Sequence, residues 1–388
     1  MSKINVRSFS NENEDGAPDL VGITTFSATS YFVPTRGTTA QRPSDHVEVG
    51  SLRYNYDIKN LEYYRGHTLG WSQFELIDPD LGGGTGSNAG LGTRGLFGGS
   101  GDPADGRDDI LFLTISTLGN TQVFGELSSQ KYATAGLGSR VRGVFAGGYN
   151  PSQVNTIEFV TFASLGDVID FGDTTYVARD MGGLASATRG LFFGGISTPN
   201  SPSGTNTIDY ITISQTGNAV DFGDAHAAVE GMAGMSSSTR GLICGGSNPS
   251  GGKNNISFVT ISTTGDVTDF GDMQAARHTF ATGSNSTRGM IGGGRTPDTA
   301  SGINTIDFVT IATTGNAQNF GDLTQARSAS SGVSDPTTFV VAGGSDPSIS
   351  NVIDFVTIQT TGNSLDFGDI TTTGRAQAPG GSNAHGGL

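Results

Sequence analysis

A phrase of about 48 residues returns six times from about residue 83 onward, and this internal repeat constrains the fold more than any other feature. The second glycine of a Gly-Gly pair recurs every 47 to 51 residues, at Gly99, Gly148, Gly195, Gly246, Gly294 and Gly344. A Phe-Gly pair followed by an acid recurs with the same period, at Phe124, Phe171, Phe222, Phe270, Phe320 and Phe367. Two markers with one period indicate a single structural unit in tandem.

Each repeat predicts four short strands. In the third copy, 188–195 is a short apolar segment closed by glycines, and 206–213 is rich in β-branched and aromatic residues. A Gln-Thr-Gly-Asn turn leads to a strand at 219–224, and the small residues of 231–237 suit a strand at a crowded centre. No repeat carries a long helical period. The pattern therefore predicts an all-β, six-bladed β-propeller over residues 83–388, with four strands per blade.

The order of strand, Gly-Gly, strand, Thr-Gly-Asn turn and Asp-Phe-Gly-Asp resembles a degenerate kelch repeat. The sequence departs from that family at Phe222, where kelch blades usually place a Trp. The resemblance implies a propeller fold and no particular activity. Gly-Ser-Asn-Ala occurs before the first repeat at 86–89 and again at 381–384. We expect the C-terminal copy to complete the first blade and the other to be a linker.

Residues 1–82 do not repeat and form a different unit. Residues 1–20 are polar and are expected to be a flexible tail. Residues 21–82 are expected to be a β-rich module for attachment or oligomerisation. Within it we predict a β-hairpin, with Leu52, Tyr54 and Tyr56 in one strand, a turn at 59–60, and Leu61 and Tyr63 in the returning strand. An isolated hairpin is marginal in water, so this one should pack on another chain or on its own copies.

The phrase Gly-Ser-Leu-Arg-Tyr-Asn-Tyr-Asp, followed by Leu-Glu-Tyr-Tyr and a Trp, resembles a short module in virion proteins of marine, cyanophage-type bacteriophages, especially tail fibres and other appendages. The resemblance covers about residues 21–75. It implies a structural virion protein with other tail or appendage proteins as partners, and a symmetric homo-oligomer. The aromatic residues expected to carry attachment or oligomerisation are Tyr31, Phe32, Tyr54, Tyr56, Tyr63, Tyr64 and Trp71.

The charge balance disfavours two classes of partner. Lys and Arg number 21 against 36 Asp and Glu, and a net charge of -15 repels both nucleic-acid phosphates and anionic lipid. The N-terminus lacks an apolar signal region, and no stretch is long enough to cross a bilayer. We therefore expect synthesis in the cytoplasm and no membrane insertion. The resemblance to virion proteins implies that this is a host cytoplasm and that the final location is the virion. The single cysteine, Cys244, is expected to be a small core residue.

No motif in the sequence marks a catalytic centre, a metal site or a cofactor site. Glu158, Asp209, Asp307 and Asp354 occupy one equivalent position, but Ser257 and Leu111 interrupt the series, so a structural role is favoured over a metal ring. The acidic loop at 101–109 lacks the spacing of an EF-hand. The five histidines are scattered, and no Gly-x-Ser-x-Gly elbow occurs.

Charged residues also recur with the period of the repeat. Arginines open one strand at Arg94, Arg142, Arg189, Arg240 and Arg288, and Thr338 takes their place in the sixth copy. Acids close the Phe-Gly motif at Glu126, Asp173, Asp224, Asp272, Asp322 and Asp369. Our hypothesis is structural: the arginines donate charge-assisted hydrogen bonds to these carboxylates or to loop carbonyls, and hold the blades in register.

The loops after Gly-Gly differ most between copies, as binding loops on a rigid scaffold do. The residues expected to contact a glycan there are Tyr149, Asn150, Asn200, Asn248 and Arg295. The sequence thus favours a bacteriophage adhesin or spacer that binds a host surface glycan or protein. Two alternatives stay open at this point: a propeller enzyme that acts on surface polysaccharide, and a kelch-like scaffold for protein interactions.

Overall fold

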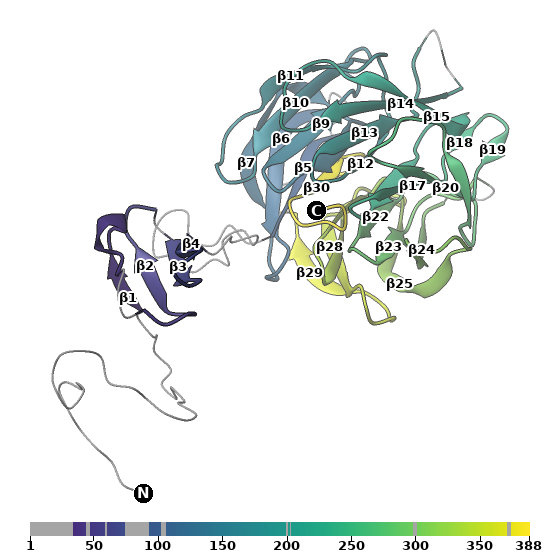
Figure 1. Cartoon of the computed structure of the whole chain (residues 1–388). Helices are drawn as coiled ribbons and strands as arrows, with labels where there is room; N and C mark the ends of the chain where they lie inside the picture. The colour runs from purple at the N-terminus through teal and green to yellow at the C-terminus, as the bar shows by residue number, and fades with distance from the viewer. Residues whose placement is uncertain are drawn as a thin grey trace, which may run out of the picture. The chain divides into compact units, whose positions relative to one another are not determined.

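The computed structural model describes residues 34–43, 47–58, 60–73, 93–101, 106–198, 201, 203–297, 301–370 and 374–388 (Figure 1). These residues are all-β, with one short 3-10 turn and no α-helix among them. The chain divides into two compact units, Met1–Pro79 and Asp80–Leu388, called here the N-terminal unit and the repeat unit. Tyr31, Phe32, Asn200 and the segment 86–89 lie outside the described residues.

The repeat unit consists of four-stranded antiparallel sheets, one for each copy of the repeat that is described (Figure 1). In the order of pairing they are β30 (Gly380–Ser382), β5 (Arg94–Ser100), β6 (Arg107–Thr114) and β7 (Gln122–Lys131); β8 (Ala135–Gly138), β9 (Arg142–Ala146), β10 (Thr156–Thr161) and β11 (Ile169–Asp173); β12 (Gly182–Ala185), β13 (Arg189–Phe193), β14 (Thr205–Thr212) and β15 (Val220–Val229); β16 (Ala233–Ser236), β17 (Arg240–Cys244), β20 (Asn255–Thr260) and β21 (Thr268–Asp272); β22 (Ala281–Ser284), β23 (Arg288–Gly292), β24 (Ile303–Thr310) and β25 (Gln318–Arg327); and β26 (Ser331–Ser334), β27 (Thr338–Ala342), β28 (Val352–Thr357) and β29 (Leu365–Asp369). A two-stranded ribbon, β18 (Ser247–Asn248) and β19 (Gly251–Gly252), lies between β17 and β20.

The small-residue strand that ends each sequence repeat pairs with the following repeat. Thus β16 pairs with β17, with Ala233 opposite Cys244. The first sheet obtains its equivalent strand from the end of the chain, where β30 pairs with β5 and Gly381 lies opposite Leu96. The prediction that the C-terminal Gly-Ser-Asn-Ala supplies this strand is confirmed.

Two hydrogen bonds at the Phe-Gly motif join neighbouring sheets. The Gly217 amide donates to the Phe171 carbonyl at 2.7 Å, and the Asp173 amide donates to the Asn218 Oδ1 at 3.1 Å. Only glycine fits between them, because a Cβ on Gly172 would lie 2.5 Å from the backbone of Gly217. This close approach explains why Phe-Gly and the Gly of each hairpin turn recur together in the sequence.

The same bonds link the last sheet along the chain to the first. The Gly119 amide donates to the Phe367 carbonyl at 3.0 Å, and the Asp369 amide donates to the Asn120 Oδ1 at 2.9 Å. A Cβ on Gly368 would lie 2.6 Å from the Gly119 carbonyl oxygen. The sheets of β29 and β6 are therefore in contact, although about 250 residues separate them in the sequence.

Apolar side chains fill the spaces between neighbouring sheets. Ile157, Phe171, Phe192 and Ile211, from the β8–β11 and β12–β15 sheets, form one such cluster, and each is at most 2 % exposed. Within each sheet the Phe of the Phe-Gly motif packs edge to face on an aromatic ring of the neighbouring strand. Cys244 is fully buried in an equivalent cluster, where burial raises the pKa of its thiol, and the prediction of a packed core residue is confirmed.

The N-terminal unit contains one four-stranded sheet. Its order is β1 (Thr35–Gly37), β2 (Leu52–Asn55), β3 (Asn60–Tyr64) and β4 (Trp71–Gln73), with β1 parallel to β2 and the turn η1 (Thr39–Gln41) between them in sequence. The predicted hairpin is confirmed in β2 and β3, where Leu52 lies opposite Tyr63. Its turn was placed wrongly: Tyr56 lies in the turn and Asn60 in the strand. The Asn55 side chain accepts the Asp57 amide at 2.9 Å and ends β2 one residue earlier.

In the described part of the chain, no helix is long and apolar enough to span a membrane.

Candidate ligand-binding face

The strands of the repeat unit end at two faces of different character. The loops after Gly-Gly and the connections that enter β8, β12, β16, β22 and β26 lie at one face, called here the loop face. The hairpin turns with Thr-Gly-Asn lie at the other, called here the turn face. Thr93 belongs to the turn face, where its hydroxyl donates to Asp335 at 3.1 Å, and Asn383 accepts the Arg94 amide there at 2.8 Å. The variable loops therefore lie opposite the point where the described repeat unit begins.

At the loop face, the connection that leads into each of the edge strands β8, β12, β16, β22, β26 and β30 contains one residue in the left-handed conformation. These residues, called here the left-handed ring, are Ala133, Asp180, Gly231, Thr279, Ala329 and Gln377, with φ between 51° and 65°. Each amide donates to the carbonyl of the ring residue in a neighbouring sheet at 2.7 to 3.1 Å, and the Ala133 amide returns to the Gln377 carbonyl. Left-handed conformations are uncommon outside glycine and cluster at functional sites, so this ring directs attention to the space it surrounds.

The left-handed ring opens onto a cavity of about 170 Å³, lined by the edge strands β8, β12, β16, β22, β26 and β30. Edge strands present main-chain N–H and C=O groups that no further strand uses, so the wall is rich in hydrogen-bonding groups. Small side chains are required here, because a Cβ on Gly183 would lie 2.7 Å from the Gly136 carbonyl oxygen. The narrow, polar wall follows directly from the small-residue strands of the sequence.

C-terminal residues contact the turn-face end of this cavity. His385 lines the cavity and its Nε2 lies 2.7 Å from the Gly138 carbonyl oxygen, while the Gly386 amide donates to the Ser284 carbonyl at 2.8 Å. The Gly387 amide donates to His385 Nδ1 at 3.1 Å, so the His385 imidazole is held in its neutral form. Burial lowers the pKa of His385. Access to the cavity is therefore left to the loop face.

Asp180 places the one carboxylate of the left-handed ring at the entrance of the cavity. Its side chain is 9 % exposed and accepts hydrogen bonds from Arg179 at 3.1 Å and from Gln377 at 3.5 Å. Burial raises the pKa of Asp180 to about 6, against the opposing charge of Arg179, and the nearby Glu230 adds to the rise. Burial also raises the pKa of Glu230. At the entrance, Asp180 therefore titrates near pH 6, with a second acid of raised pKa nearby.

Two tyrosines continue this group outward to the rim. Tyr132 and Tyr149 exchange backbone hydrogen bonds at 3.3 and 2.9 Å, and their rings lie 5.5 Å apart. The Arg179 guanidinium lies 5.7 Å from the centre of the Tyr149 ring. Aromatic faces, a guanidinium and a carboxylate therefore form one continuous surface from the rim to the cavity.

The predicted loop residues lie on this face but differ in what they do. Tyr149 belongs to the rim. Asn150 and Asn248 each donate from Nδ2 to the outer strand of the neighbouring sheet, at the Gln130 carbonyl of β7 and the Ala228 carbonyl of β15, both at 3.1 Å. Arg295 is exposed and its backbone bridges to His278. Asn200 lies outside the described residues.

Sequence reasoning missed Arg179, Asp180, Glu230 and Gln377. A signal for them existed, because they break the pattern of small residues in the connections between repeats. Their convergence became visible only when the left-handed ring brought connections from distant repeats to one place.

The recurring arginines use the second of the two predicted partners. Arg142, Arg189, Arg240 and Arg288 donate from Nη1 to carbonyls of a neighbouring sheet, at Ile213, Ile261, Ile311 and Ile358, over 2.8 to 3.1 Å, and Arg94 donates to Phe162. Each guanidinium also lies over an aromatic ring of its own sheet. Among the described residues no ion pair joins them to Asp173, Asp224, Asp272, Asp322 or Asp369. Those acids join sheets through their backbone amides, and they lie at other positions along the strands than the arginines: Arg189 pairs with Thr212, whereas Asp224 pairs with Thr207.

The buried acids of the repeats are paired across sheet interfaces. Lys131 contacts Glu158 at 2.9 Å, Arg327 contacts Asp354 at 2.7 Å, and Arg277 contacts Asp307. Where Ser257 replaces the acid, Val229 stands in place of the cation. Asp209 lacks a cation and accepts the Thr175 amide and hydroxyl at 2.7 and 2.8 Å, and burial raises its pKa. In the described ranges, no group of three or more His, Cys, Asp or Glu is placed to hold a metal.

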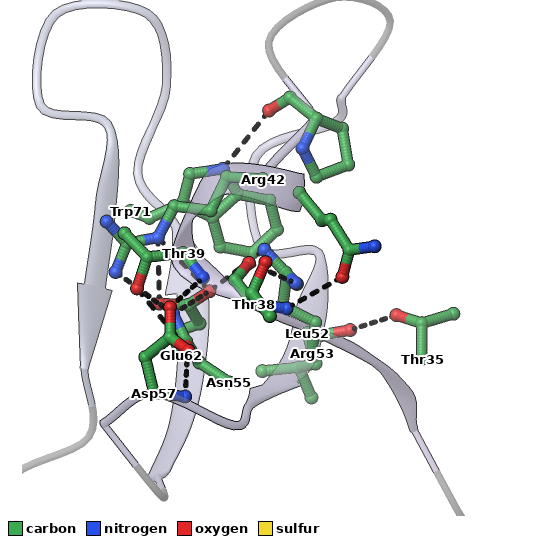
Figure 2. A network of polar contacts seen from close by, with 12 residues as sticks. Thr35, Thr38, Thr39, Arg42, Leu52, Arg53, Asn55, Asp57, Glu62 and Trp71 are labelled. Carbon is green, nitrogen blue, oxygen red and sulfur yellow. Dashed lines mark hydrogen bonds and ion pairs between the residues drawn. The ribbon is translucent and has the colours of Figure 1, made fainter.

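The N-terminal sheet has its charged groups inside (Figure 2). Glu62, fully buried, accepts from Arg42 at 2.6 Å, from Asn55 at 3.1 Å, and lies 3.2 Å from Arg53. Burial by itself raises the pKa of Glu62, but hydrogen bonds from Arg42 and Asn55 outweigh it and lower the pKa. The guanidinium of Arg53 lies 5.6 Å from the Trp71 ring.

The opposite face of this sheet carries apolar side chains and is called here the outer face. Leu52 is 49 % and Leu61 is 39 % exposed, and Tyr54 and Tyr63 project on the same side because side chains alternate along β2 and β3. The predicted attachment residues therefore divide. Tyr54 and Tyr63 belong to the outer face and Tyr56 to the turn, whereas Tyr64 and Trp71 pack together on the covered face, with ring centres 5.3 Å apart.

No family model matches this chain, and no curated protein matches it at a significant level.

Proposed function

We propose that the repeat unit is a six-bladed β-propeller that binds a host surface ligand through its loop face, as the adhesin of a bacteriophage tail fibre or appendage. The observation that carries the proposal is the left-handed ring, whose six hydrogen bonds return to their starting residue around a cavity with polar groups at its entrance. The bonds from Gly119 to Phe367 and from Asp369 to Asn120 support closure of the blades, as does the pairing of β30 with β5.

The arrangement of the two faces supports binding at the loop face. Loops of variable sequence and the entrance of the cavity lie there, while Thr93 and the C-terminal residues belong to the turn face. A rigid scaffold with divergent loops on one face is typical of recognition domains. The proposed receptor is a glycan or protein of the host surface.

The N-terminal unit serves attachment in this proposal. Its resemblance to appendage modules of marine bacteriophages supplies the virion context. The apolar outer face, with Leu52 and Leu61, supports docking on another virion protein or on a further copy in a homo-oligomer.

One observation favours a second function, an enzyme that cleaves surface polysaccharide. Asp180 lies at the entrance of the cavity with Glu230 nearby, and burial raises the pKa of both, as it does for general acids of glycoside hydrolysis. A reducing-end assay with purified protein and host envelope polysaccharide separates the two functions. The adhesin yields no new reducing ends, while the enzyme loses its activity in the variant Asp180→Asn.

Two measurements test the adhesin. Mass spectrometry of purified virions detects the chain, and the purified full-length protein adsorbs to host cells and competes with virions for adsorption. Absence of the chain from virions overturns the virion assignment and favours an intracellular scaffold. Presence in virions without adsorption leaves a spacer in place of an adhesin.

A further inference from the structure

The entrance of the cavity has three properties that together restrict its ligand. It is compact, it is lined by main-chain hydrogen-bonding groups, and it is flanked on one side by aromatic rings. A volume of about 170 Å³ lies below the roughly 300 to 1,000 Å³ of pockets that enclose drug-sized molecules. One small ring-shaped ligand fits such a space, and a longer molecule can enter only by its end.

The side chains at the entrance are suited to bind hydroxyl groups of a ligand. Asp180 and Gln377 present a carboxylate and an amide from the two positions of the left-handed ring that flank Ala133. Thr134 lines the cavity and is 6 % exposed, yet its Oγ1 has no hydrogen-bond partner within the described residues. A buried hydroxyl without a partner costs free energy, which a ligand hydroxyl recovers.

The rim adds an apolar surface beside these polar groups. Tyr149 is half-buried, and its ring contacts Tyr132 and lies under the Arg179 guanidinium. Tyrosine offers a flat apolar face with a polar tip, which suits a ligand whose ring has an apolar face and a polar edge. Arg179 and Asp180 balance each other's charge, so the entrance does not select a strongly charged ligand.

We propose that the entrance of the cavity binds a neutral hexose at the end of a glycan, with Asp180 and Gln377 on its hydroxyl groups and Tyr149 against its ring. This inference rests on the proposed function, and it names the chemical class of the receptor. The sugar enters from the loop face, because His385 and the residues after it contact the other end of the cavity.

The test uses the full chain and methyl glycosides of glucose, galactose and mannose, with binding followed by saturation-transfer NMR and calorimetry. We expect at least one of them to bind with a Kd on the order of 1 mM, as is reasonable for one small ring. The variant Asp180→Asn weakens that binding at least tenfold. Asparagine tolerates the left-handed conformation, so the variant keeps the ring. The variant Tyr149→Ala weakens binding at least threefold.

The matched control is Gln215→Ala, at an exposed turn of the turn face, which leaves binding unchanged. Circular dichroism and the melting temperature verify folding of each variant. Binding of no glycoside overturns the inference, and so does wild-type affinity in Asp180→Asn. Host-cell adsorption is measured separately: adsorption that persists in a protein without hexose binding refutes this site and leaves the adhesin standing. Hexose binding without adsorption supports the site and contradicts the adhesin.

Discussion

The repeat unit and the N-terminal unit are both built from four-stranded sheets, but they bury opposite kinds of side chain. Between the repeat sheets, Ile157 and Phe192 are fully buried. In the N-terminal sheet, the buried positions of β2 and β3 hold Arg53, Asn55 and Glu62 beside Tyr64, and the outer face carries Leu52 and Leu61. Apart from the parallel pair β1 and β2, the strands of both units pair antiparallel, so the difference lies in what covers each face.

The two units are therefore stabilised by different interactions. Repeat sheets cover one another, and their stability comes mainly from apolar area removed from water. A single sheet has no second layer of its own kind, so the N-terminal unit relies on a polar network over one face and leaves Leu52 and Leu61 exposed on the other.

The largest effect is expected from Arg277→Val, which leaves Asp307 buried without its cation. The free energy of unfolding should fall by about 3 to 5 kcal/mol, measured by denaturant titration. The double variant Arg277→Val with Asp307→Ser copies the pair Val229 and Ser257 of the neighbouring interface and should return close to the wild-type value. A double variant as unstable as the single one contradicts the pairing.

In the N-terminal unit, Glu62→Gln removes the charge that Arg42 and Arg53 share. We expect a loss of about 2 to 3 kcal/mol, confined to this unit, because a buried charged hydrogen bond is lost while the shape is kept. Trp71, the only tryptophan, reports on this unit by fluorescence. The control is Glu48→Gln, outside the network. Simultaneous loss of the repeat unit is inconsistent with the separation of the two units.

The inter-sheet arginines should have a smaller effect. Arg189→Ala removes a hydrogen bond to the Ile261 carbonyl and the contact with the Tyr210 ring, and should cost about 1 to 2 kcal/mol. The sixth repeat offers the reverse change: Thr338→Arg can supply the missing arginine and should raise the melting temperature slightly. An unchanged melting temperature in Arg189→Ala, with loss of ligand binding, assigns the arginine to the ligand.

The pH dependence reports on the end of the cavity. His385 has a lowered pKa in the folded state, so its neutral form is favoured and stability is lost as pH falls through the unfolded value near 6.5. The slope is at most about 1.4 kcal/mol per pH unit for one proton. His385→Asn should reduce the dependence of the melting temperature on pH between pH 7 and pH 5.5, and the remaining slope comes from His226 and His278, whose pKa values are also lowered by burial. A slope that is unchanged in this variant contradicts a role of His385.

The smallest effect on stability is expected at the outer face. Leu52→Thr and Leu61→Thr should each change the free energy of unfolding by less than about 1 kcal/mol, because Leu52 is already 49 % and Leu61 39 % exposed. Their effect appears in association, measured by analytical ultracentrifugation and by incorporation into virions. Unchanged association and incorporation in the double variant contradict docking at this face.

The sequence by itself determined the strands of the repeat unit, because their information is local and is given six times over. Gly-Gly ends one strand, Thr-Gly-Asn makes a hairpin turn, and Phe-Gly marks a close approach, as Gly172 and Gly217 now show. The C-terminal strand of the first sheet could also be predicted, because its Gly-Ser-Asn-Ala was left without another role.

Only the tertiary structure decided which side chains meet. Asp180 and Gln377 are 197 residues apart, and no local pattern joins them. The left-handed ring brings them together because each sheet delivers one connection to the same place. For the same reason the sequence could not predict which face of the N-terminal sheet is covered. The alternation of side chains along β2 and β3 separates two faces but does not say which one is buried.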